Sequence, residues 1–203
     1  MNIALIGASG RVGSRLAKEL IGRGHTVTGI ARDAAKIAQQ PGLTAQSADA
    51  TRPDQLAPVL AGHEIVVSAA NFASSDPAAL LAASRQSDVK RLLVVGGAGS
   101  LEIAPGQALI DTPQFPEAYK PEASAGRDFL NVLKKEQRID WTYLSPSAEF
   151  VPGERTGKYR LGDDQLLTDA NGRSWITMED YAIALADEIE HPQHSRKRFT
   201  VGY

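Results

Sequence analysis

The chain begins with a short apolar run that leads directly into three evenly spaced glycines. In the stretch NIALIGASGRVGSRLAKEL, residues 2–20, the pattern is G-x-x-G-x-x-G. The apolar run has the length of a buried strand, and the residues after the glycines repeat with the spacing of an amphipathic helix. This order of strand, glycine-rich turn and helix predicts the first part of a βαβ unit, and it constrains the fold more than any other feature.

A turn of this kind directs backbone N–H groups and the positive end of a helix dipole at one point, which suits a pyrophosphate. Gly7 permits the tight turn, Gly10 lets the backbone approach the phosphates, and Gly13 lets the helix pack closely on the strand. The turn follows a strand and opens a helix within about 30 residues, and this context favours dinucleotide binding. The residues expected to bind the cofactor here are Gly7, Ser9, Gly10, Arg11, Val12 and Gly13.

Strand and helix signals alternate along most of the remaining chain. Continuous apolar strands linked by crossover helices predict an α/β fold with a doubly wound parallel sheet of the Rossmann type. The expected strands are Ile3–Ile6, Thr26–Ala31, Leu43–Ser47, Ile65–Ala70, Leu92–Val95 and Trp141–Leu144, and further helices are expected at 53–61, 77–87 and 121–136.

The last quarter of the chain departs from this alternation. The stretch GKYRLGDDQLLTD, residues 157–169, predicts a small hairpin with Asp163 and Asp164 in its turn. Thr177 and Asp180 resemble a capping box that opens a helix at 178–190, and RFTVGY predicts a closing strand. We expect one domain over 1–203, with a small C-terminal extension and substrate-side segments at about 98–122 and 146–177.

The composition and charge of the chain argue against nucleic acid, membranes and metal ions as binding partners. A formal net charge of −2 indicates no basic surface for nucleic acid, and no run approaches the roughly 20 apolar residues that span a bilayer. The absence of cysteine excludes disulfides and cysteine-based metal sites and is typical of a cytoplasmic protein. His191 and His194 follow a helix end and are not interpreted as metal ligands, so no metal site is expected.

The end of the second expected strand bears on which dinucleotide binds. Arg32 stands where an acidic residue would bind the ribose of NAD, and Asp33 beside it is interpreted as a helix N-cap. One charge-assisted hydrogen bond to a 2′-phosphate contributes roughly 1.5–3 kcal/mol, so Arg32 predicts a preference for NADPH over NADH. Arg11 could reach the same phosphate from the other side. The alternative for Arg32 is a solvated strand end.

Several motifs resemble those of the atypical short-chain dehydrogenase/reductases. They are GASGRVG, ARD, ADATRPDQL, VVSAA and RLLVVGGAGSL, and the resemblance continues through YLSPSAEFVPGERTGKYRLG and ITMEDYAIALADEI. The group that they resemble most contains candidate NADH-flavin reductases and is related to biliverdin reductase B and to NmrA-like proteins. The resemblance implies an NAD(P)H-binding Rossmann domain over nearly the whole chain.

The same resemblance implies roles for individual residues. It places an adenine contact at Asp49 and Ala50, cofactor-lining residues at Ser68, Ala69 and Ala70, and a loop that closes on the nicotinamide at Ser145 and Pro146. For each of these positions the alternative is structural: an aspartate that flanks a helix, or a small residue selected for packing.

The chain departs from the ordinary members of that superfamily at their Tyr-x-x-x-Lys pair. Ala123 stands four residues after Tyr119, where the lysine would be, although Lys120 follows directly and could converge with Tyr119 in a loop. Reduction of a ketone needs a positioned acid, whereas a conjugated flavin or quinone ring accepts hydride with solvent protons nearby. The missing pair therefore disfavours alcohol or sugar chemistry and favours flavin-like acceptors.

Two later segments offer candidate substrate contacts. Ser100 and Tyr119 are the candidate catalytic residues, and the candidate substrate-binding residues are Phe115, Phe150, Arg155 and Tyr159. Aromatic faces suit a flat ring, and the Arg155 guanidinium suits a phosphate or carboxylate. Alternatively, Phe115 and Phe150 fill a minor core, and Ser100 caps a turn.

Three functions are consistent with these observations. The first is an NADPH-dependent reductase of a small flavin, quinone or similar conjugated acceptor. The second is an NmrA-like regulator that senses NADPH without turnover. The third is an epimerase, dehydratase or carbonyl reductase with an unrecognised acid. The oligomeric state is left open, because the uncovered helix faces cannot be identified from the sequence.

Overall fold

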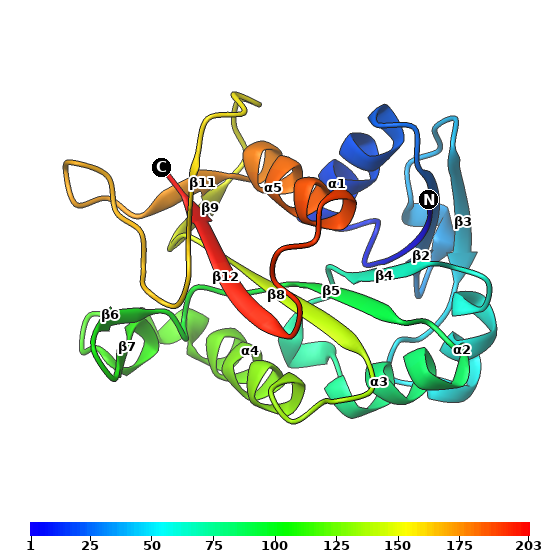
Figure 1. Cartoon of the computed structure of the whole chain (residues 1–203), viewed down its shortest axis with the longest axis horizontal. Coiled ribbons are helices and arrows are strands. Elements are labelled where there is room, and N and C mark those ends of the chain that lie inside the picture. Colours follow the sequence, from blue (N-terminus) through cyan, green and yellow to red (C-terminus); the bar gives the residue numbers. More distant parts are fainter.

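A single large sheet organises the molecule, and the structure, a computed structural model, describes all 203 residues (Figure 1). Its strands are β1 (Asn2–Ile6), β2 (Thr26–Ala31), β3 (Leu43–Ser47), β4 (Ile65–Ser68), β5 (Arg91–Val95), β8 (Asp140–Pro146), β10 (Arg160–Gly162) and β12 (Lys197–Gly202). Two small pairs lie outside it: β6 (Glu102–Ala104) with β7 (Gln107–Ala108), and β9 (Glu149–Val151) with β11 (Trp175–Thr177).

The strand order is β10-β12-β8-β5-β4-β1-β2-β3, and every neighbouring pair is parallel except β10 with β12. From β1 the chain builds outward through β2 and β3, then crosses back and builds outward through β4, β5, β8 and β12. This order confirms the doubly wound fold. It also places the switch point between β1 and β4, where such folds bind ligands beyond the carboxyl ends of the strands.

Helices cover both faces of the sheet. The helices α1 (Arg11–Gly22) and α5 (Met178–Glu190) lie over one face, and α2 (Pro53–Leu60), α3 (Pro77–Gln86) and α4 (Lys120–Leu133) lie over the other (Figure 1). Each face has its own apolar core, of 22 and 21 buried residues. All four residues of β4 are buried, as expected of a central strand with helices on both faces. None of the helices is both long and apolar enough to cross a membrane.

Four short 3₁₀ turns complete the chain: η1 (Ala34–Lys36), η2 (Phe72–Ser74), η3 (Leu109–Asp111) and η4 (Glu117–Tyr119). Asp33 caps η1 as predicted, because its carboxylate accepts a hydrogen bond from the Ala35 amide at 3.1 Å. The strand expected over Ile65–Ala70 ends two residues earlier, at Ser68. The chain leaves the sheet there and forms the loop that precedes η2.

The hairpin predicted for residues 157–169 is wrong. Residues Arg160–Gly162 form β10, which pairs antiparallel with the far end of β12 and not with the following residues. The chain bends at Asp163 and Asp164, but Gln165 after the bend bridges Glu102 and does not return to β10. The Asp164 carboxylate accepts a hydrogen bond from Arg198 in β12 at 2.6 Å. A local turn signal indicates where a chain bends, but the exposed edge of β12, distant in sequence, determined what the strand pairs with.

Asp180 connects α5 to an irregular segment and to the end of the chain. The Thr177 hydroxyl caps the Asp180 amide at 3.1 Å, as predicted, but the Asp180 carboxylate does not complete a capping box. It accepts hydrogen bonds from the Thr156 hydroxyl, from the amides of Thr156 and Gly157 at 2.7 and 2.9 Å, and from the Tyr203 hydroxyl at 2.7 Å. Desolvation raises the pKa of this fully buried carboxyl, but these hydrogen bonds outweigh it and lower the pKa below its usual value.

Replacement of Asp180 by Asn is therefore expected to lower the free energy of unfolding by about 1.5–3 kcal/mol at neutral pH. The folded-state pKa of Asp180 lies below its unfolded value of about 3.9, so its charge stabilises the fold above that pH and loses this effect as the pH falls through the folded pKa. Urea unfolding of wild type and Asp180→Asn should show a difference that shrinks below about pH 4.

The matched control is Asp163→Asn, because Asp163 is exposed and its side chain has no hydrogen-bond partner. That variant should unfold like the wild type. A difference between wild type and Asp180→Asn that persists unchanged in acid would contradict the proposed role of the Asp180 charge.

Candidate functional site

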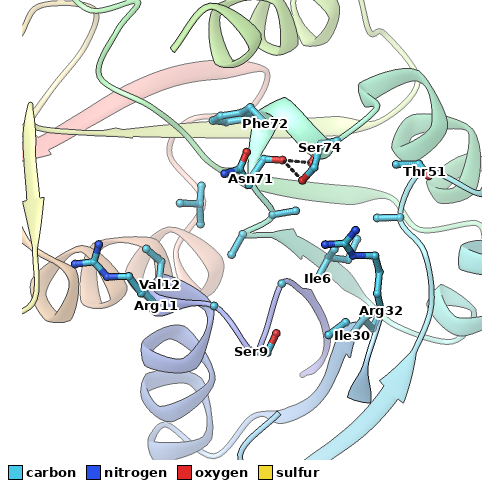
Figure 2. A pocket seen from close by; sticks show the side chains of 18 of the residues that line it. Ile6, Ser9, Arg11, Val12, Ile30, Arg32, Thr51, Asn71, Phe72 and Ser74 are labelled. Carbon is cyan, nitrogen blue, oxygen red and sulfur yellow. Dashed lines mark hydrogen bonds between the residues drawn. The ribbon is translucent and has the colours of Figure 1, made fainter. Parts of the chain in front are cut away.

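A cleft of 710 Å³ opens at the switch point, beyond the carboxyl ends of β1, β2, β4 and β5, and is here named the glycine-turn cleft (Figure 2). Its walls come from the turn before α1, the end of β2, the loop before α2, and the loop that carries η2. Ser9 lies on the turn and Val12 at the start of α1, Asn71 and Phe72 lie on the opposite loop, and Arg32 lies at one end (Figure 2).

The glycines of the turn are required for steric reasons. Gly7 adopts a φ of +80°, and a Cβ there would lie 2.7 Å from the carbonyl oxygen of Ala69 on β4's outgoing loop. A Cβ at Gly13 would overlap the carbonyl oxygen of Gly7, so the first turn of α1 packs directly on the backbone of the loop. Gly10 is the N-cap residue of α1, and its amide donates to the Gly7 carbonyl at 2.9 Å.

The first turn of α1 leaves its amides free. The helix has no side-chain cap and no acidic residue in this turn, and Ser14 is the first residue whose amide bonds back into the helix, to Gly10 at 2.9 Å. The N–H groups of Arg11, Val12 and Gly13 consequently have no partner in the protein. Free amides at the positive end of a helix suit an anion such as a pyrophosphate.

Two guanidinium groups at the cleft are also unpaired. Arg32 and Arg11 line the cleft, and neither side chain forms an ion pair or a hydrogen bond within the protein. They point to opposite sides of the turn, with Arg32 beside the loop that carries Thr51 (Figure 2). The Thr51 amide and hydroxyl, with a smaller contribution from Arg32, hold the pKa of Asp49 below its usual value. Arg32 is thus available to an anionic ligand.

A second cavity of 490 Å³, here named the adjoining pocket, lies next to the glycine-turn cleft. The two cavities share Phe72, Gly96 and Glu122 as wall residues. The remaining wall comes from the loop after β5, the turns before α4 and the start of β9. Its other lining residues are Gly97, Ala98, Gly99, Leu109, Thr112, Gln114, Phe115, Pro116, Tyr119, Ala123, Pro146, Ser147, Ala148, Glu149 and Phe150.

The wall between the two cavities is held by Glu122. Its carboxylate accepts hydrogen bonds from the amides of Phe72 and Ala73 at 2.7 and 2.8 Å, which fixes η2 against the start of α4. The Phe72 ring packs on Phe129 and Tyr143, with centroids 5.3 and 6.0 Å away. The backbone in the wall is thereby held in place from both sides.

Tyr143 stands behind this wall and is not available for proton transfer. Burial raises the pKa of its phenol well above the usual value, so the group stays protonated. Its hydroxyl donates to the Gly126 carbonyl at 3.2 Å and accepts from the Gly97 amide at 3.1 Å. The phenol thus orients the Gly97 backbone of the adjoining pocket.

Most of the residues expected to bind the cofactor line the glycine-turn cleft. Four do not. Gly13 lies beneath the turn, Ser68 is buried at the end of β4, and Pro146 lines the adjoining pocket. Ser145 is fully buried in β8 with its hydroxyl unpaired. Those in the cleft are Gly7, Ser9, Gly10, Arg11, Val12, Arg32, Asp49, Ala50, Ala69 and Ala70.

The candidate catalytic and substrate residues divide into two groups. Phe115, Tyr119 and Phe150 line the adjoining pocket. The Phe150 ring also packs on Tyr181, 4.7 Å between centroids, so it belongs partly to the core. Ser100 does not line the pocket, and its hydroxyl lies 3.3 Å from the Arg198 guanidinium.

Arg155 and Tyr159 do not line the adjoining pocket, contrary to expectation. The segment after β9 turns away from the pocket and runs over the α1–α5 pair. Arg155 binds the Glu19 carboxylate there through two hydrogen bonds of 2.8 and 2.9 Å, and the Tyr159 hydroxyl donates to Asp187 at 2.6 Å. These helix carboxylates attract the segment, and no local sequence pattern indicates them.

Sequence reasoning missed several wall residues. Asn71 and Phe72 follow the fourth strand directly, and the rule that ligands bind beyond the carboxyl ends of parallel strands could have found them. Glu122 and Gln114 carry no comparable signal, because their place in the wall depends on how α4 packs against η2.

Comparisons with known proteins agree with this geometry. Residues 7–192 match the NAD(P)H-binding family. The uncharacterized protein YwnB of Bacillus subtilis is 41% identical over 212 residues, which cover 99% of this chain and 98% of that protein.

Two solved structures resemble the whole chain. A candidate epimerase from Bacteroides thetaiotaomicron is 44% identical with a TM-score of 0.94, covering 100% of this chain and 96% of the other. A candidate NADH-flavin reductase from Streptococcus pneumoniae is 33% identical with a TM-score of 0.84, covering 100% and 99%. The chain belongs to the NAD(P)H-binding family, as its sequence motifs predicted.

The contact between Gly13 and Gly7 yields a stability prediction. Gly13→Ala should lower the free energy of unfolding by about 1–3 kcal/mol or more, because the added methyl must displace the backbone of the turn. Gly22→Ala, in the same helix, meets nothing within 4 Å and should be neutral or stabilise by up to about 1 kcal/mol. Urea unfolding of the two variants measures the contrast, and equal tolerance at both positions would show that the packing is not tight.

Proposed function

We propose that this member of the NAD(P)H-binding family is an NADPH-dependent reductase that transfers hydride to a flavin, quinone or similar conjugated acceptor. One observation carries the proposal. The adjoining pocket and the glycine-turn cleft share the wall residues Phe72, Gly96 and Glu122, so a flat ring in the pocket would lie next to a ligand in the cleft. Hydride transfer requires this kind of contact, with reacting atoms about 3–3.5 Å apart.

The residues of the cleft fit the cofactor. The free amides at the start of α1 suit its pyrophosphate, and Arg32 suits the 2′-phosphate that distinguishes NADPH from NADH. A Cβ at Gly7 would occupy space that the turn needs against Ala69. When bound, the nicotinamide supplies the hydride. The protein supplies the binding groups and the alignment of the two cavities.

The adjoining pocket holds no tyrosine–lysine pair. Tyr119 is 67% exposed and lines the pocket, whereas Lys120 does not line it and forms an ion pair with Glu117. Reduction of a conjugated ring does not require such a pair, because solvent can protonate the product anion. This supports a flavin-like or quinone-like acceptor over a ketone or alcohol.

An epimerase is the second candidate, since the relative that is 44% identical is a candidate epimerase. Epimerisation through a transient ketone would need an acid–base group in contact with the substrate. Glu122 is the one acidic group at the junction of the two cavities, and both its carboxylate oxygens already accept backbone hydrogen bonds. The reductase therefore remains the better-supported function.

Anaerobic mixing of the purified protein with NADPH and riboflavin or menadione is expected to oxidise the NADPH. Its near-ultraviolet absorbance should fall at a rate that saturates with acceptor, while nucleotide sugars give no change. Tight NADPH binding without oxidation across a broad acceptor panel would support a sensing regulator instead. Turnover of a nucleotide sugar would support the epimerase.

Arg32→Ala should weaken NADPH binding about 10- to 100-fold, the loss of one charge-assisted hydrogen bond, and leave NADH binding nearly unchanged. Arg11→Ala is the matched control, because Arg11 points to the opposite side of the turn and should not alter the NADPH-to-NADH ratio (Figure 2). Calorimetric titration of both coenzymes measures the effect. Equal weakening of both coenzymes by Arg32→Ala would contradict the assignment.

A further inference from the structure

We propose that the adjoining pocket selects uncharged or cationic flat acceptors and rejects acceptors that carry a phosphate or carboxylate. This selectivity rests on the proposed reductase function, because it specifies the class of substrate that the pocket takes. It runs against the sequence-based expectation that Arg155 would bind an anionic group of the substrate.

The charge of the pocket wall carries the proposal. None of its 18 lining residues is lysine, arginine or histidine, and the two charged ones, Glu122 and Glu149, are acidic. The aromatic and aliphatic wall, with Phe72, Phe115 and Phe150, suits the face of a flat ring. A phosphate in this pocket would lose hydration without gaining a cationic partner.

Four cationic side chains on the segments around the pocket form ion pairs with carboxylates that do not line it. Each forms an ion pair outside the pocket wall, so none is free to turn inward without leaving a partner. The pairs are Arg155 with Glu19, Lys120 with Glu117, Arg127 with Asp111, and Arg198 with Asp164.

Arg173 binds Glu149 in the pocket wall, but it does not make the wall cationic. Its guanidinium binds the Glu149 carboxylate and lies 4.5 Å from the centre of the Trp175 ring. This hydrogen bond lowers the pKa of Glu149, so the two groups form a neutral pair. Glu122 has no ion-pair partner, and its negative charge remains at the junction of the two cavities.

The start of α4 does not provide an anion site either. A helix N-terminus favours anions through its free amides and its dipole. Here the first turn contains Pro121, which has no amide hydrogen, and Glu122, whose charge already offsets the dipole. The glycine-turn cleft is the opposite case, with free amides at α1 and two unpaired guanidiniums, Arg11 and Arg32.

Riboflavin and FMN form a matched pair for the test, because they share one ring system and differ by a phosphate. Quenching of flavin fluorescence by the NADP⁺-loaded protein should give a dissociation constant for riboflavin about tenfold or more below that for FMN in dilute buffer. The difference should shrink in about 1 M salt, where charges are screened beyond about 3 Å.

Equal affinity for the two flavins, tighter binding of FMN, or no quenching by either would overturn the charge selectivity. These outcomes are distinct from failure of the proposed function. Tighter binding of riboflavin than of FMN without NADPH oxidation would support the charge selectivity and contradict the reductase function. Equal turnover of riboflavin and FMN would support the reductase function and contradict the charge selectivity.

A variant that adds a positive charge to the pocket wall also tests the charge selectivity, and an uncharged substitution at the same position serves as its control. Gln114 is exposed, lines the pocket and makes no hydrogen bond in the structure, so substitutions there should be tolerated. In Gln114→Lys the ratio of the FMN to the riboflavin dissociation constant should fall about fivefold or more, whereas in Gln114→Met, of similar size and no charge, it should not change. The same ratio in both variants would contradict the electrostatic explanation.

Discussion

The close contact between the backbones of Gly13 and Gly7 determines the geometry of the whole site. Because neither residue has a Cβ, α1 begins directly against the end of β1, and the turn fits beside Ala69 on the loop that follows β4. The three free amides of the helix then face the switch point of the sheet. Any larger side chain would move the helix, and with it the dipole and amides that suit a pyrophosphate.

A second constraint joins the two cavities. Glu122 binds the amides of η2 from the start of α4, and Phe72 packs on Tyr143 and Phe129 behind the wall. The same few residues therefore bound both cavities. The first cavity contains two unpaired guanidinium groups, Arg11 and Arg32, beside the carboxylates of Asp49 and Glu122, whereas the lining of the second contains no cation. The proposed pairing of a highly charged cofactor with an uncharged acceptor rests on this difference.

Much of the fold could be predicted because its signals are local. Buried parallel strands such as Ile65–Ser68 are continuous apolar runs, the glycine spacing identifies the turn, and Asp33 and Thr177 cap the elements that follow them. The hairpin at 157–169 failed for the converse reason. Which strand β10 pairs with depends on the free edge of β12, about 40 residues later, and no local pattern encodes it.

The sequence by itself determined the doubly wound parallel sheet, the glycine turn and the presence of an arginine at the end of the second strand. These depend on residues within one βαβ unit, where chain connectivity forces the parts together. Only the tertiary structure decided that Arg155 and Tyr159 bind carboxylates of α1 and α5, and that Glu122 reaches η2. Such contacts join segments 28–136 residues apart, so they arise from packing and charge pairing across the folded molecule.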